Sequence, residues 1–121
     1  MLLRGARGAI TADANTEEAI LDATREILLA LIEANEIREE MVASVLFTTT
    51  PDLTAVYPAA AARMIGWRHT ALLGFQEAPV SSGLDRCIRV LVHWTTDRAL
   101  HEVEHIYLKG AQVLRPDLKK T

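Results

Sequence analysis

The chain has 121 residues, a net charge of −3, and a composition in which half of the residues are hydrophobic. This length predicts a single domain, residues 1–121, with a genuine apolar core. Mild acidity with both signs interspersed excludes a general binder of nucleic acid or of anionic membranes, which would need a basic face. Ten of the thirteen basic residues are Arg, whose planar fork suits carboxylates and phosphates, so the composition weakly favours a small anionic ligand.

The cysteine content and the hydropathy of the sequence indicate the cellular compartment in which the protein is expected. Cys87 is the only cysteine in the sequence, so no intrachain disulfide can form and a reducing compartment is expected. The first ten residues lack the apolar stretch of a signal peptide, and no segment approaches the roughly 20 apolar residues that span a membrane. We therefore expect a cytoplasmic protein.

The first half of the chain predicts a strand and then a long helix. The strand covers residues 2–11, where apolar and small residues predominate. A helix is predicted from about Asn15 to Ala34, because Asn15 and Glu18 have capping-box spacing and apolar residues then recur with a helical period. Asn35 is the expected stop.

The second half predicts three more strands around a short helix. A strand at 41–49 ends in a Pro–Asp turn, and the short helix follows from Pro58 to Gly66. A third strand covers 68–75, and a loop then leads to the most apolar run, Arg86–Trp94. Strands alternating with helices predict an α/β fold of α+β type, with helices packed on a mixed β-sheet.

The run Arg86–Trp94 is predicted to be the central strand, covered on both faces. Alternation places Arg89 on the face opposite Val90. A guanidinium cannot lose its charge, so Arg89 needs an anionic partner or a polar cavity. Two interpretations stay open at this point: a structural ion pair with an internal carboxylate, or a pocket for an anionic ligand. Arg7 repeats the pattern on the first strand, beside small residues that leave room for a ligand.

One regular motif points to a metal. Residues 98–105 could form a short helix on which His101 and His105 bind Zn²⁺ while Glu102 acts as general base. However, such a helix has only about two turns, and no His follows His105 to supply a third ligand. A solvated helix face is the favoured interpretation, and no metal is expected.

Five segments occur in order between residues 4 and 118: RGARGAIT, TPDLTAVYPAAAAR, QE, LDRCIRVLV and HIYLKGAQVLRPDL. In this order and spacing they resemble the small trimeric bacterial chorismate mutases, a class distinct from the all-helical one. The resemblance implies a homotrimer of pseudo-α/β-barrel architecture, also seen in Rid-like proteins, with active sites at the subunit interfaces. It also implies the rearrangement of chorismate to prephenate, in phenylalanine and tyrosine biosynthesis, without a cofactor.

The resemblance also implies the site residues. Arg89 should contact the ether oxygen and a carboxylate, Arg7 a carboxylate, and Tyr107 the same end of the substrate, while Glu77 should accept a hydrogen bond from the ring hydroxyl and orient Arg89. Further substrate-binding positions are Tyr57, Ala59, Arg63, Leu73, Gly74, Phe75, Gln76, Leu114 and Arg115. Residues 115–121 are expected to form a mobile tail when the site is empty.

Some positions depart from the pattern of the family. Ala60 and Gly74 stand where some members have Lys and Cys, and Tyr57 replaces Phe. Loss of the Lys removes one possible carboxylate contact. On the sequence alone, two other functions stay open: a non-catalytic or Rid-like trimer that binds a small carboxylate, and a zinc hydrolase that uses His101 and His105.

Overall fold

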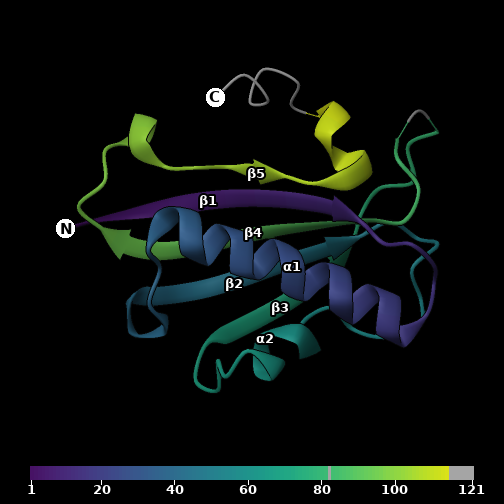
Figure 1. Ribbon diagram of the computed structural model, residues 1–121, viewed down its shortest axis with the longest axis horizontal. Coiled ribbons are helices and arrows are strands. Elements are labelled where there is room, and N and C mark those ends of the chain that lie inside the picture. The colour runs from purple at the N-terminus through teal and green to yellow at the C-terminus, as the bar shows by residue number, and fades with distance from the viewer. Residues whose placement is uncertain (82, 115–121) are drawn as a thin grey trace.

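The computed structural model describes residues 1–81 and 83–114. Figure 1 shows a twisted sheet crossed on one face by a long helix, with a short helix beside one edge strand. The elements are β1 (Leu2–Thr11), α1 (Glu17–Asn35), β2 (Val42–Thr49), α2 (Ala60–Met64), β3 (Ala71–Gln76), β4 (Cys87–Thr96) and β5 (Ile106–Tyr107). Short 3₁₀ turns cover Glu39–Met41, Leu100–Glu102 and Lys109–Leu114.

The five strands lie in the order β3-β2-β4-β1-β5. The central strand β4 is antiparallel to both of its neighbours, β1 and β2. The outer strands β3 and β5 pair in parallel with β2 and β1. The prediction of a mixed sheet with the Arg86–Trp94 run at its centre is therefore confirmed.

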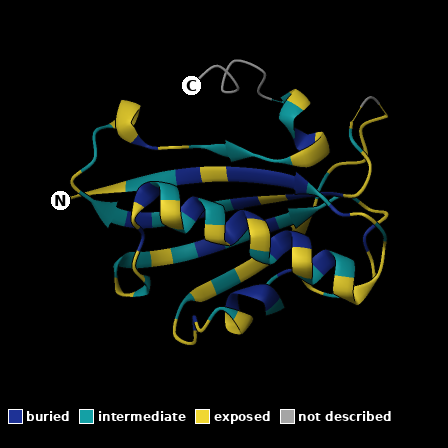
Figure 2. Cartoon of the chain, viewed as in Figure 1, coloured by how far each residue is buried: buried dark blue, intermediate teal, exposed yellow. Residues whose placement is uncertain are grey.

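The main core lies between α1 and the sheet. The apolar stripe of α1, including Ile27 and Leu31, is fully buried against β-strand residues such as Val92. Figure 2 shows the result, with buried residues of α1 turned to the sheet and exposed ones turned outward. Gly8 lets the helix come close, because a Cβ placed there would lie 2.8 Å from Ile27 Cγ1 and 2.9 Å from Leu31 Cδ1. The glycine in this strand therefore marks a close helix approach.

The opposite face of the sheet is largely open, so the prediction that β4 is covered on both faces is wrong for this chain. Arg89, Leu73 and Phe75 are exposed on that face. A small second core closes only one end of it, where Ala9, Cys87 and Ala111 pack together under Tyr107 and Leu114. Solvent-exposed apolar side chains therefore surround a charged Arg, and this combination is typical of an interface or a ligand site that is not filled.

The ends of α1 differ from the prediction by about one residue. Thr16 is the N-cap, and its hydroxyl accepts a hydrogen bond from the backbone N–H of Ala19. Asn15 instead uses its side chain to bind the loop at Thr54. At the other end, Glu36 adopts the left-handed conformation with φ of 55°, and Asn35 is buried inside the last turn. Neither helix in the described part of the chain has the length and hydropathy of a membrane span.

Candidate active site

The sheet register places one residue from each of the five strands in a single row, and Thr48, Arg89 and Tyr107 are among them. Thr48 lies opposite Arg89 in the β2–β4 ladder, and Ala9 lies opposite Arg89 in the β1–β4 ladder. At the two edges, Phe75 pairs with Thr48 and Tyr107 pairs with Ala9. Because residues that pair across a sheet share a face, this row crosses the open face, and the small Ala9 leaves room between Arg89 and Tyr107.

Glu77 holds one side of the Arg89 guanidinium. It follows the last residue of β3, and its backbone N–H donates to the carbonyl of Thr49 at 2.9 Å. Its Oε1 lies 3.0 Å from Arg89 Nε, and its Oε2 accepts a hydrogen bond from Thr48 Oγ1 at 2.9 Å. The ion pair that the sequence left as one possibility is therefore present. The Arg89 side chain nevertheless stays 47% exposed, so its outer nitrogens can also reach a ligand.

A cavity of about 230 Å³ lies over this row. Arg7 and Arg89 line it with Tyr107 and Phe75, so three of the four predicted catalytic residues share one hollow and the fourth, Glu77, is bound to Arg89. Two guanidiniums and a phenol around a hollow of this size suit a small molecule that carries carboxylates.

Other predicted binding residues line a separate hollow of about 610 Å³ at the β3 edge. Tyr57, Gly74 and Gln76 lie here, and Phe75 borders both this hollow and the first one. Tyr57 is 83% exposed, unusual for an aromatic side chain in a folded chain. Within one chain, therefore, the two groups of predicted residues do not form a common pocket.

The other described residues of the prediction line neither of these two hollows. Arg63 is exposed on α2 and Ala59 is half-buried just before it. Leu73 is exposed on β3, on the same face as Phe75. Leu114 packs beside Tyr107 on the small second core. Arg115 and the predicted tail 115–121 lie outside the described residues.

Cys87 lies two residues before Arg89 and is buried. Burial raises the pKa of its thiol to about 11, and the negative charge of Glu77 adds to this effect, while Arg89 opposes it. The thiol is therefore protonated at neutral pH and is a poor nucleophile. This agrees with the expectation that Cys87 serves packing.

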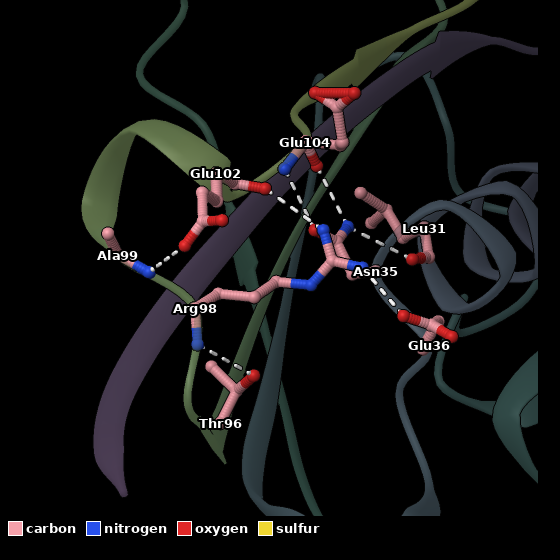
Figure 3. Close-up of polar contacts among 8 residues, drawn as sticks. All are labelled: Leu31, Asn35, Glu36, Thr96, Arg98, Ala99, Glu102 and Glu104. Atoms are coloured by element: carbon pink, nitrogen blue, oxygen red, sulfur yellow. Dashed lines mark hydrogen bonds and ion pairs between the residues drawn. The ribbon is translucent and has the colours of Figure 1, made fainter.

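A network at the C-terminal end of α1 holds the segment that leads into β5 (Figure 3). The Asn35 side chain donates to the carbonyls of Leu31 and Glu104 at 3.0 and 2.9 Å, and its Oδ1 accepts from Glu104 N–H at 2.8 Å. Arg98 reinforces the same segment by donating to the carbonyl of Glu102 at 3.0 Å. These bonds fix the chain three residues before Tyr107.

The zinc interpretation fails in the structure. Only Leu100–Glu102 forms a 3₁₀ turn, so the predicted helix over 98–105 is absent and the two His do not lie on one helical face. His105 Nδ1 instead accepts a hydrogen bond from the backbone N–H of Arg7 at 3.0 Å. Among residues 1–81 and 83–114, no cluster of His, Cys, Asp or Glu has an arrangement that could hold a metal ion.

Two contributors were missed from the sequence, Thr48 and Asn35. Thr48 stands in a run of three threonines that alternation alone cannot rank, since only the pairing with β4 shows which one faces Arg89. The sequence predicts only a helix stop at Asn35, and the bonds of Asn35 to Glu104 span 69 positions of sequence, so no local pattern reveals them.

Comparison with known proteins gives concordant matches. Residues 3–118 match the family model for chorismate mutase type I. The chain is 51% identical over 119 residues to chorismate mutase AroH of Thermus thermophilus, covering 98% of both chains. It is 43% identical over 122 residues to chorismate mutase AroH of Bacillus subtilis (strain 168), covering 100% of this chain and 96% of the relative. A solved chorismate mutase of Clostridium thermocellum has a similar fold, with a TM-score of 0.89 and 41% identity over 91% of this chain and 98% of that one.

Proposed function

This chain belongs to the chorismate mutase type I family and is a chorismate mutase, and from this premise we propose that chorismate rearranges over the row that contains Arg89. The observation that carries the proposal is the Arg89–Glu77 pair, because Glu77 binds Nε at 3.0 Å while the side chain stays 47% exposed. The carboxylate fixes the guanidinium plane, and Arg89 lines a cavity together with Arg7 and Tyr107.

The chemistry is intramolecular. The ether C–O bond of chorismate breaks as a new C–C bond forms, and prephenate results without a nucleophile, a metal or a proton shuttle. An enzyme can therefore contribute in two ways: it can confine a reactive conformer, and it can place positive charge beside the ether oxygen as that oxygen becomes enolate-like. Fixed donors in a partly enclosed hollow supply both.

We assign the roles accordingly. Arg89 donates to the ether oxygen and to one carboxylate, and it is the main transition-state stabiliser. Arg7 binds a carboxylate, and Tyr107 donates its hydroxyl at the same end of the substrate. Glu77 accepts a hydrogen bond from the ring hydroxyl and holds Arg89. The support for these roles is that three of the four side chains line one cavity and the fourth is ion-paired to Arg89.

We further propose a homotrimer in which each site is formed by two neighbouring subunits. The open face carries Leu73 and Phe75 at 55% and 48% exposure, an apolar surface that a second copy would cover. The β3-edge hollow with Tyr57 lies apart from Arg89 in one chain, and a neighbour would bring its own copy of that edge over the Arg89 cavity. Side chains proposed to come from this edge are Tyr57, Ala59, Arg63, Leu73, Gly74, Phe75 and Gln76.

Two smaller proposals accompany this assembly. Leu114, which packs beside Tyr107, closes the site from the C-terminal side, together with Arg115 beyond the described residues. We also place the reaction in the cytoplasm, and the support is the single cysteine of the sequence.

A subunit-mixing experiment tests the shared site. Arg89→Ala and Arg63→Ala are each expected to lose most of their activity, because they remove opposite sides of the same site. When the two variants are unfolded together and refolded in equal amounts, about a quarter of the interfaces of a random trimer combine two intact sides. The mixture should regain about that fraction of wild-type activity. No recovery, from a mixture shown by light scattering to be trimeric, would contradict a site shared between subunits.

A further inference from the structure

The end of β2 holds the carboxylate of Glu77 through a second contact. Thr48 Oγ1 donates to Glu77 Oε2 at 2.9 Å, while Glu77 Oε1 faces Arg89 Nε at 3.0 Å. The backbone N–H of Glu77 also donates to the carbonyl of Thr49 at 2.9 Å. The backbone and both carboxylate oxygens of Glu77 therefore have partners, two of them from consecutive residues of β2.

The geometry gives the Thr48 contact a directional role. A carboxylate bound through one oxygen can still rotate about its Cγ–Cδ bond, whereas different partners on its two oxygens set the angle of its plane. Glu77 is well shielded, with its side chain 17% exposed, so water competes weakly for Oε2. Thr48 itself lies directly opposite Arg89 in the sheet and lines the same cavity.

We propose that Thr48 is a positioning residue for the rearrangement: its hydroxyl sets the plane of the Glu77 carboxylate and, through it, the orientation of the Arg89 guanidinium. This inference rests on the proposed roles of Glu77 and Arg89. Because the single proton of Thr48 is committed to Glu77, Thr48 has none to donate to a substrate carboxylate. Its contribution reaches the reacting atoms only through the ion pair.

Three variants isolate the hydroxyl. Thr48→Val keeps the β-branched shape that suits a strand and removes the donor, whereas Thr48→Ser keeps the donor. Thr95→Val is the matched control, because the Thr95 hydroxyl, at the other end of β4, also donates a hydrogen bond, to the carbonyl of Met41 just before β2 at 3.3 Å. Thermal unfolding and light scattering establish that each variant folds and assembles. If Thr48→Val does not fold, Thr48→Ala removes the same hydroxyl with a smaller side chain.

The kinetic expectation is a loss in kcat with little change in KM, because orientation of Arg89 matters most in the transition state. Thr48→Val should lower kcat by roughly tenfold, the effect of losing one hydrogen bond to a charged group. Thr48→Ser should stay within about threefold of wild type, and Thr95→Val should not differ from wild type.

A double-mutant cycle decides whether Thr48 acts through Glu77. In the Glu77→Ala background, Thr48→Val should change kcat by less than about twofold, because the partner of the hydroxyl is already gone. Additive losses, or a Thr48→Val enzyme with wild-type kcat beside an impaired Glu77→Ala enzyme, would overturn this inference alone. Wild-type kinetics for Glu77→Ala would instead overturn the proposed role of Glu77, and the inference with it.

Discussion

Replacing Asn35 with Ala removes the side chain that joins the C-terminal end of α1 to the segment entering β5 (Figure 3). Asn35 is 1% exposed and takes part in three hydrogen bonds, to Leu31 O, Glu104 O and Glu104 N–H. The variant removes the side-chain partner of these three backbone groups, of which the Leu31 carbonyl is buried and the two Glu104 groups are partly buried.

The size of the effect follows from those three bonds. A typical hydrogen bond contributes about 1 kcal/mol net, and a buried group left unpaired costs about 1–3 kcal/mol. Because the Glu104 groups are only partly buried, we expect Asn35→Ala to lower the free energy of unfolding by about 2–4 kcal/mol. For a chain of 121 residues, about 1 kcal/mol corresponds to roughly 4 °C, so Tm should fall by roughly 8–16 °C.

Asn15→Ala is the matched control. Asn15 also has three side-chain hydrogen bonds, one donated to Thr54 Oγ1 and two accepted from the N–H groups of Thr54 and Ala55, but the residue is exposed. Water can replace the partners of Asn15, so Asn15→Ala should lower the free energy of unfolding by about 1 kcal/mol or less.

The assay is thermal and urea unfolding of the two variants and wild type at one protein concentration, since the proposed trimer would make stability depend on concentration. Asn35→Ala should be the less stable variant by at least about 1 kcal/mol. Equal losses in the two variants, or an Asn35→Ala protein as stable as wild type, would refute the reasoning from burial.

One substitution, at Gly8, and one chemical modification, of Cys87, test the packing around the sheet. Gly8→Ala should cost about 1–3 kcal/mol of stability, because its Cβ would lie 2.8 Å from Ile27 Cγ1 and 2.9 Å from Leu31 Cδ1, and unchanged urea unfolding would contradict that contact. Iodoacetamide should label Cys87 far more slowly in the native protein than in urea at pH 8, because the thiol is buried and its pKa is raised to about 11. Equal labelling rates in the two states would contradict this account of the thiol.

The strands were the most predictable part of the fold. Residues 2–11 form β1 as predicted from their apolar and small residues. In β4 the burial follows the side-chain period of two that is typical of a strand. The same period placed Arg89 on the face opposite Val90, and only the latter is buried. The predicted helix at 98–105 failed because a helical spacing of His and Glu is not sufficient for a helix; the described chain has only the turn Leu100–Glu102 there.

The site was harder to predict from local patterns, because its geometry depends on pairing between distant strands. The Thr48 to Glu77 bond joins positions 29 apart, and the row from Phe75 to Tyr107 depends on all four strand pairings. The alternation within one strand shows which face a side chain takes, but it does not identify the residue that pairs with it on a distant strand. The resemblance to the family therefore supplied the grouping of Arg7, Glu77, Arg89 and Tyr107, and the register explains why these residues can act together.

The central claim is that the Arg89 guanidinium, held by Glu77, stabilises the transition state. The most direct test is the loss of the diene absorbance of chorismate with wild type, Arg89→Ala, Arg89→Lys and the control Arg25→Ala, whose side chain pairs with Asp22 at 3.2 Å on the surface of α1. Each protein is assayed with and without EDTA.

Arg89→Ala should lower kcat by about 10²–10³. Arg89→Lys should also be strongly impaired, because an ammonium cannot reproduce the fork of the guanidinium, whereas Arg25→Ala and EDTA should leave the activity unchanged. A folded Arg89→Ala enzyme with wild-type turnover would contradict the role of Arg89 in stabilising the transition state.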